Sequence, residues 1–244
     1  MKKITYYMLM VMTLCGMTMA SCSDDEWQPG PEQTDGVQAY IYTDATSYTY
    51  LPADEQSFTL HVVRRNTTEA ATIHLTAEGE DFVVPATVAF NAGEGEKEVP
   101  ISFDIAIGTE SSVTISIAEG EGYIYGSPMV TVSVARDYTW QSLGTWTLTS
   151  SFYGAEGTTD VYKAQEANIY KAVAPYEEGY DLLFNVDGSN VTVEGQPVVS
   201  SYGDYGVLSV EGTGTITGNT INVTLLFYVS AGYFGEFNEV FSGD

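Results

Sequence analysis

The stretch KEVPISFDI at residues 97–105 decides the fold class, because apolar side chains occupy every second position from Val99 through Ile101 and Phe103 to Ile105. Successive side chains of a β-strand point to opposite faces, so this alternation produces one apolar and one polar face. The pattern predicts a strand that covers a hydrophobic core on one side.

The same alternation recurs across residues 37–136, and the sequence of this region has no helical periodicity. Turn-rich segments separate the alternating runs at about 12-residue spacing, which gives roughly seven strands in about 100 residues, the pattern of a two-sheet sandwich. The other alternating positions are Phe58, Leu60, Val62, Ala71, Ile73, Leu75, Val113, Ile115, Ile117, Val130, Val132 and Val134.

One part of this region resembles a known family. GEDFVVPATVAF at 79–90, followed by Gly93-Glu94 and the alternation over 97–103, is similar to a Calx-beta-type immunoglobulin-like domain across about residues 40–136. Gly93 permits a turn with positive φ, and Val88 and Phe90 are expected in the core. The resemblance implies an immunoglobulin-like β-sandwich, of a kind frequent near the anchor of Bacteroidota-type surface lipoproteins.

In calcium-binding members of that family, acids of the end loops hold Ca²⁺, which takes six to eight oxygens. The segment IAIGTE after Asp104 lacks the closely spaced acids that the family uses there, so we expect no calcium or other metal site. The acids available near the loops are Glu78, Glu80, Asp81, Asp104, Glu110, Glu119 and Glu121.

Residues 137–244 form a second predicted domain that is richer in aromatics and again antiparallel β. Gly218-Asn219 is a hairpin signal that leads into the alternating stretch 220–229, and Gly212-Thr213-Gly214 is interpreted as a strand-linking turn. Sandwich and small β-barrel are both compatible with the pattern. The prediction is an all-β chain, with an immunoglobulin-like sandwich at 37–136 followed by a second antiparallel sandwich or barrel at 137–244.

The first 21 residues have the features of a lipoprotein signal peptide. Lys2 and Lys3 precede an apolar run of about 14 residues, shorter than the roughly 20 that span a membrane, and small residues lead to Cys22. This arrangement resembles a bacterial lipobox, in which the cysteine is acylated and becomes the first residue of the mature protein. We expect Cys22 to attach the protein to the membrane through lipid.

The residues after Cys22 are acidic and flexible in composition. Ser23, Asp24, Asp25 and Glu26 resemble the export signal that sends Bacteroidota-type lipoproteins to the outer leaflet, and residues 22–36 form a Pro- and Gly-rich tether. The expected location is therefore the outer membrane, with the protein lipid-anchored and exposed at the cell surface.

Charge and composition restrict the chemistry. The net charge is −25, and it becomes −27 when residues 1–21 and their two lysines are removed, which disfavours nucleic acid as a partner. Cys15 and Cys22 are the only cysteines, so the mature domains have no disulfide. His61 and His74 are expected on solvent-facing strand positions, opposite each other if their strands pair through 66–69. No catalytic motif is found, so we expect no enzyme activity and no cofactor.

Three functions remain as hypotheses. The favoured one is a non-catalytic binding module for glycans beside an outer-membrane transporter, because sugar capture uses flat aromatic faces with a few polar groups nearby. The alternatives are a structural or adhesive surface protein, and a hydrolase. The candidate ligand-binding residues are Tyr176, Tyr180, Tyr202 and Tyr205, with Trp140 and Trp146 as weaker candidates because a Trp at the start of a domain often packs into its core.

Overall fold

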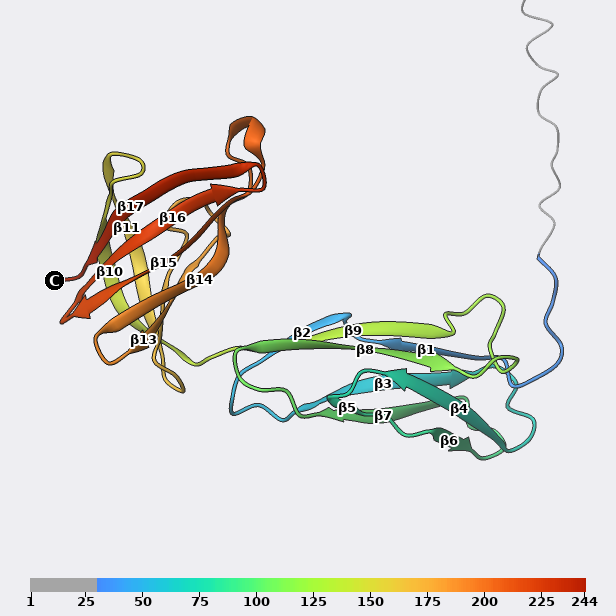
Figure 1. The fold of residues 1–244 in the computed structure, drawn as a ribbon. Helices are drawn as coiled ribbons and strands as arrows, with labels where there is room; N and C mark the ends of the chain where they lie inside the picture. The colour runs from blue at the N-terminus through green and yellow to red at the C-terminus, as the bar shows by residue number, and fades with distance from the viewer. Residues whose placement is uncertain (1–29) are drawn as a thin grey trace, which may run out of the picture.

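A computed structural model describes residues 30–244, in which regular structure is β-strand except for one 3-10 turn, η1 (Gly203–Tyr205). Figure 1 shows two β-domains joined by a single segment. The expected signal peptide, Cys22 and the acidic signal at 23–26 lie outside the described residues. Among the described residues no helix is long and apolar enough to cross a membrane.

The N-terminal domain is a sandwich of two sheets, which confirms the predicted fold class for this region. One sheet has the order β1-β3-β7-β5 and the other β2-β9-β8-β4-β6. Pairing is antiparallel except between β2 and β9. The strands are β1 (Ala39–Thr43), β2 (Ser47–Tyr50), β3 (Ser57–Arg64), β4 (Ala71–Glu78), β5 (Phe82–Val83), β6 (Thr87–Phe90), β7 (Glu96–Phe103), β8 (Thr109–Ile117) and β9 (Met129–Arg136).

The stretch that predicted the fold behaves as its alternation requires. In and directly after β7, Ile101, Phe103 and Ile105 are buried in the core between the two sheets, and Val99 packs against that core from a partly buried position. Val88 and Phe90 of β6 are buried in the same core. Gly93 has φ 87°, the positive value expected for its turn.

The expectation that His61 and His74 lie opposite each other is wrong. His61 belongs to β3, which pairs with β1 and β7, whereas His74 belongs to β4, which pairs with β6 and β8. The segment between them therefore crosses from one sheet to the other instead of forming a hairpin. Local sequence does not distinguish these two connections, because both need only a polar turn.

The C-terminal domain is a closed barrel of eight strands, which decides between the two predicted alternatives. Each strand pairs antiparallel with the next in sequence, and β17 returns to pair with β10. The strands are β10 (Trp140–Ser150), β11 (Ala155–Ala164), β12 (Ile169–Ala172), β13 (Leu182–Asp187), β14 (Asn190–Val199), β15 (Leu208–Thr217), β16 (Thr220–Val229) and β17 (Gly232–Ser242). Eight strands leave an interior that side chains just fill, and here Phe184, Phe227 and Phe241 are among the fully buried residues.

Two glycines expected to link strands instead lie inside β15. Gly212 and Gly214 pair with Leu225 and Val223 of β16, and a Cβ built on either glycine would lie 2.1 Å from a β16 carbonyl oxygen. Glycine permits this close approach where a barrel strand bends. The predicted hairpin at Gly218-Asn219 is confirmed, since Thr217 pairs with Thr220 and Gly218 has φ 56°.

Because successive strands of the barrel run in opposite directions, four of the connections between them lie at the same end. We call this end the mouth. These are the β10–β11 turn (151–154), the β12–β13 loop (173–181), the β14–β15 loop (200–207) and the β16–β17 turn (230–231). In Figure 1 the β14–β15 loop with η1 rises at the upper right of the barrel. The linker enters at the opposite end, where β10 begins.

Candidate functional site

Aromatic side chains gather at the mouth and several are exposed. Tyr153, Tyr205 and Phe234 are 44%, 58% and 37% exposed. The Phe234 ring lies 5.8 Å from Tyr205 and 6.0 Å from half-buried Phe152, centroid to centroid. Phe152 in turn contacts Tyr153 at 4.9 Å, so the exposed rings belong to one connected cluster.

The base of this cluster is fixed by the barrel core. Phe152 stacks on the fully buried Phe227 at 4.0 Å with parallel rings, and it also contacts Tyr202 at 5.7 Å. Tyr202 and Phe234 meet at 5.2 Å. The exposed aromatic rings are therefore held by packed neighbours, which reduces the conformational entropy that a ligand would have to remove.

A cavity of about 270 Å³ opens beside the cluster on the inner side of the β10–β11 hairpin. Its walls are mostly apolar and combine Leu148, Ser150, Tyr153, Ala155, Glu156, Gly157, Pro175 and Tyr176. The opening exists because β12 is short and pairs with β11 only at 161–163, so the β12–β13 loop must cover the rest of that side. Its volume lies just below the usual range for small-molecule sites.

Glu239 of β17 lies buried behind this cavity. Its carboxylate accepts hydrogen bonds from the Phe152 backbone N–H and the Tyr176 hydroxyl, both at 3.1 Å. Burial raises the pKa of Glu239, although the bonds from Phe152, Ser150 and Tyr176 partly oppose that rise. One carboxylate thus connects the β10–β11 turn and the β12–β13 loop to β17.

A second carboxylate joins two of the mouth loops. Glu177 of the β12–β13 loop accepts hydrogen bonds from the Ser200 backbone N–H at 2.7 Å and from the Ser200 hydroxyl at 2.5 Å. Burial, followed by the neighbouring Glu239, raises the pKa of Tyr176 well above its ordinary value, so Tyr176 stays a neutral hydrogen-bond donor. Because these hydrogen bonds hold the mouth loops in place, we expect the site to be preformed.

The structure brings only part of the sequence-predicted set to the mouth. Tyr176 and Tyr202 pack against the barrel core and are only partly exposed, whereas Tyr205 is exposed as we expected of loop aromatics. Tyr180 lies in the same loop as Tyr176 and is partly buried. The loops carry polar backbone but close over an apolar interior, so their aromatics turn inward.

The two tryptophans lie away from the mouth. Trp146 is 2% exposed and belongs to the barrel core, with its indole N–H donating to the Leu143 carbonyl at 3.3 Å. Trp140 begins β10 at the linker end, donates to Asp137 at 3.0 Å and carries the Lys171 ammonium 4.2 Å from its ring centroid. Neither is placed to share a ligand with the tyrosines of the mouth.

Sequence reasoning missed Phe152, Tyr153, Phe234 and Glu239. Phe152 and Tyr153 follow a strand, and Phe234 and Glu239 belong to the last one, so each has the local pattern of an ordinary barrel residue. Only closure of the barrel by β17 against β10 brings them together. Glu239 was nevertheless detectable in principle, because an acid at an alternating apolar position of a strand is unusual.

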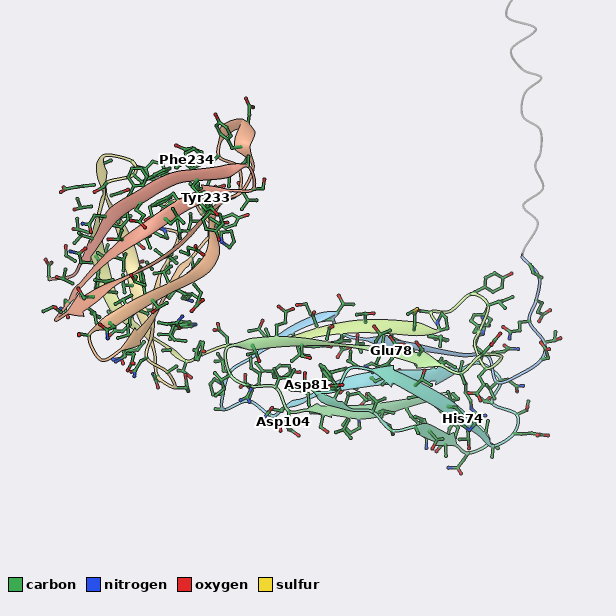
Figure 2. All side chains as sticks on the ribbon, in the orientation of Figure 1. His74, Glu78, Asp81, Asp104, Tyr233 and Phe234 are labelled. Carbon is green, nitrogen blue, oxygen red and sulfur yellow. The ribbon has the colours of Figure 1, made fainter. Side chains whose placement is uncertain are left out.

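The sandwich offers contacts of a different kind. His61 lies 3.2 Å from Glu96 and 3.4 Å from Asp44, and His74 lies 2.6 Å from Glu121. Figure 2 labels His74, Glu78, Asp81 and Asp104 on this domain. Within residues 30–244 no three His, Cys, Asp or Glu side chains gather in a way that could hold a metal ion.

Comparison with known proteins adds little to this geometry. No protein-family model matches the chain, and no curated protein matches it. The apo form of the Calx CBD1 domain is similar at 20% identity over 41% of this chain and 98% of that chain, with a TM-score of 0.32. CBD12 from CALX1.2 has 17% identity over 68% and 84%, with a TM-score of 0.33.

A third structure, the calcium binding domain CBD12 of CALX1.1, has 14% identity over 78% of this chain and 81% of that chain, with a TM-score of 0.32. Because these identities and TM-scores are low, both domains are described from their own strand order and register.

Proposed function

We propose that this protein is a non-catalytic binding module that captures a glycan at the mouth of its C-terminal barrel. Sugar rings bind through flat aromatic faces together with a few directed polar groups. The observation that carries the proposal is the joining of the exposed aromatic cluster to an apolar cavity at one end of a closed barrel. The N-terminal sandwich then acts as a spacer.

The proposal includes a location at the cell surface. Acylation at Cys22 would anchor the chain in the outer membrane, and the acidic residues at 23–26 would direct it to the outer leaflet beside an outer-membrane transporter. Metabolic labelling with a fatty-acid analogue is expected to mark the wild type and not Cys22→Ala. Protease added to intact cells should trim the wild type, and replacement of Asp24, Asp25 and Glu26 by alanine should protect it.

Binding is tested with a glycan array, followed by titration calorimetry on every glycan that binds. Tyr205→Ala and Phe234→Ala are expected to weaken binding about tenfold or more each, as for anchor residues at interfaces. The melting temperature of Tyr205→Ala should change little, because Tyr205 is 58% exposed. Tyr125→Ala is the matched control, since Tyr125 is 57% exposed but belongs to the β8–β9 loop of the sandwich.

Two results would contradict the proposal. Equal weakening by Tyr125→Ala would show that the mouth is not the site. A wild type that binds no glycan would leave the alternative of a structural or adhesive surface protein, for which a pull-down of partner proteins from the cell surface is the next measurement.

A further inference from the structure

The barrel has many acidic side chains and few basic ones, and several of the acids lie at the mouth. Glu239 lies buried behind the cavity, and Glu177 and Glu178 lie in the β12–β13 loop that covers it. Glu156 of the cavity wall pairs with exposed Thr149, so its carboxylate lies on the outer face of the barrel, 3.5 Å from the Thr149 hydroxyl. Asp204 stands beside Tyr205 in η1. Two of the four connections at the mouth, the β12–β13 and β14–β15 loops, therefore carry carboxyl groups.

The cavity has no basic residue in its wall. Within residues 140–244, all of which the structure describes, the only basic side chains are Lys163 and Lys171. Lys163 lies 5.4 Å from the ring centroid of Tyr170. Because the next residue, Ala172, points into the barrel, Lys171 lies on the outer wall, 3.8 Å from Asp181.

A ligand carboxylate or sulfate at the mouth would consequently lie near the acids of these loops, and the cavity wall offers it no counter-charge. Like charges brought together in a partly desolvated site oppose binding, and such repulsion is a common source of specificity. The hydroxyl groups of Ser150, Tyr153 and Tyr176 suit an uncharged polyol instead. The aromatic faces contribute equally to neutral and acidic rings, so the carboxyl groups decide between them.

We infer that the mouth selects neutral glycans and rejects acidic ones, such as chains of uronic acids or sulfated sugars. This inference rests on the proposed function, since it names the class of sugar that the same site accepts. Screening by salt should weaken the discrimination, because the Debye length falls from about 30 Å at 0.01 M to about 3 Å at 1 M ionic strength.

The test uses pairs of oligosaccharides that differ only at C6, one with the primary alcohol and one with the carboxylate, measured by titration calorimetry on the mature protein. At about 0.02 M salt we expect the acidic partner to bind at least tenfold more weakly than the neutral one. At 0.5 M salt this ratio should fall several-fold.

Charge reversal localises the effect. Glu178→Lys, at an exposed position of the β12–β13 loop, is expected to strengthen binding of the acidic oligosaccharide at least fivefold, while binding of the neutral one changes less than twofold. Asp187→Lys is the matched control, because it changes net charge equally but lies at the opposite end of the barrel, where β13 ends. An equal gain from both variants would mean that net charge, not the mouth, sets the preference.

The outcomes separate the two proposals. Acidic binding as tight as neutral binding at low salt overturns the selectivity and leaves glycan capture standing. Failure of every neutral and acidic oligosaccharide to bind overturns glycan capture itself, and the selectivity with it.

Discussion

The sandwich and the barrel use buried ionisable side chains in opposite ways. In the sandwich, Arg64 is 3% exposed and donates to the carbonyl oxygens of Glu69, Asn91 and Glu94 at 2.7–2.8 Å. In the barrel, buried Glu239 accepts hydrogen bonds from the groups around it. Arg64 holds the turns at the end of the sandwich core that is opposite the linker. Glu239 holds the loops around the cavity of the barrel.

The two domains also differ in how they use aromatic residues. The sandwich packs Phe58, Phe82 and Phe103 inside, with each of them less than 10% exposed, and its exposed aromatics, Tyr42 and Tyr125, lie on separate segments. The barrel leaves Tyr153, Tyr205 and Phe234 partly in solvent at its mouth. Position, and not aromatic content, therefore identifies a candidate site. Four experiments test this difference between the domains.

The largest effect is expected from the close approach of β15 to β16 in the barrel. In Gly214→Val, the new Cβ would lie 2.1 Å from the Asn222 carbonyl oxygen, so the strands must separate. We expect a loss of at least about 3 kcal/mol of barrel stability, the upper range for overpacking. Calorimetry should show the barrel transition shifted or lost and the sandwich transition unchanged.

Gly157→Ala provides the control for that experiment. A Cβ at Gly157 meets nothing within 4 Å, and the residue lies on β11 of the same barrel. Its melting curve should match the wild type. If Gly214→Val also melted like the wild type, the account of β15 as one continuous strand bent at glycines would be wrong.

The next effect concerns the buried arginine of the sandwich. Arg64→Met keeps much of the aliphatic packing but leaves three carbonyl oxygens without their charged donor. Hydrogen bonds to charged groups contribute about 1.5–3 kcal/mol, so a loss of about 2–3 kcal/mol from the sandwich transition is expected. Arg65→Met is the control, because Arg65 is exposed and donates to the hydroxyl of partly buried Tyr123. Equal losses for the two variants would contradict the role assigned to Arg64.

The buried carboxylate of the barrel should respond to pH with the opposite sign from a typical acid. Because burial raises the pKa of Glu239 in the folded protein, its contribution to stability is greatest below its unfolded pKa and is lost as pH rises through the folded value. Glu239→Gln removes the titration. The free energy of unfolding of the barrel in Glu239→Gln, relative to the wild type, should therefore increase as pH rises from 4 to 7.

Chemical denaturation at several pH values measures this difference. Glu156→Gln, at an exposed position of β11, should track the wild type across the same range. A gap between Glu239→Gln and the wild type that stays constant with pH would show that the folded and unfolded pKa values are equal. A gap that grows toward low pH would show that the carboxylate is stabilised in its charged form.

The sequence predicted the elements of both domains better than it predicted the site. Alternation specifies strands, so the stretch 97–105 and the run 220–229 were assigned correctly, and Gly218-Asn219 identified its hairpin. Partner choice between strands depends on contacts far apart in the chain. This is why the pairing of β3 with β7, the closure of β17 on β10 and the interior position of Gly212 could not be read from local pattern.

The candidate site could be predicted only in part, for the same reason. The loops of Tyr176 and Tyr205 were identified from their turn residues, but only the barrel brings them to one end with Phe152 and Phe234. The direction of Tyr176 toward Glu239 could not be foreseen, because the acid that receives its hydrogen bond lies 63 positions later in the chain.

The smallest effect is expected from calcium. The acids of the sandwich loops are spread over separate segments, and the Asp81 carboxylate already accepts a hydrogen bond from the Ser111 hydroxyl at 2.5 Å. Adding 1 mM Ca²⁺ should change the melting temperature of the sandwich by less than about one degree. A site with a dissociation constant near 10 µM would instead add about 2.7 kcal/mol, which corresponds to several degrees for a domain of this size. Mg²⁺ at the same concentration controls for ionic strength, and a shift of several degrees with Ca²⁺ alone would establish a calcium site in the sandwich.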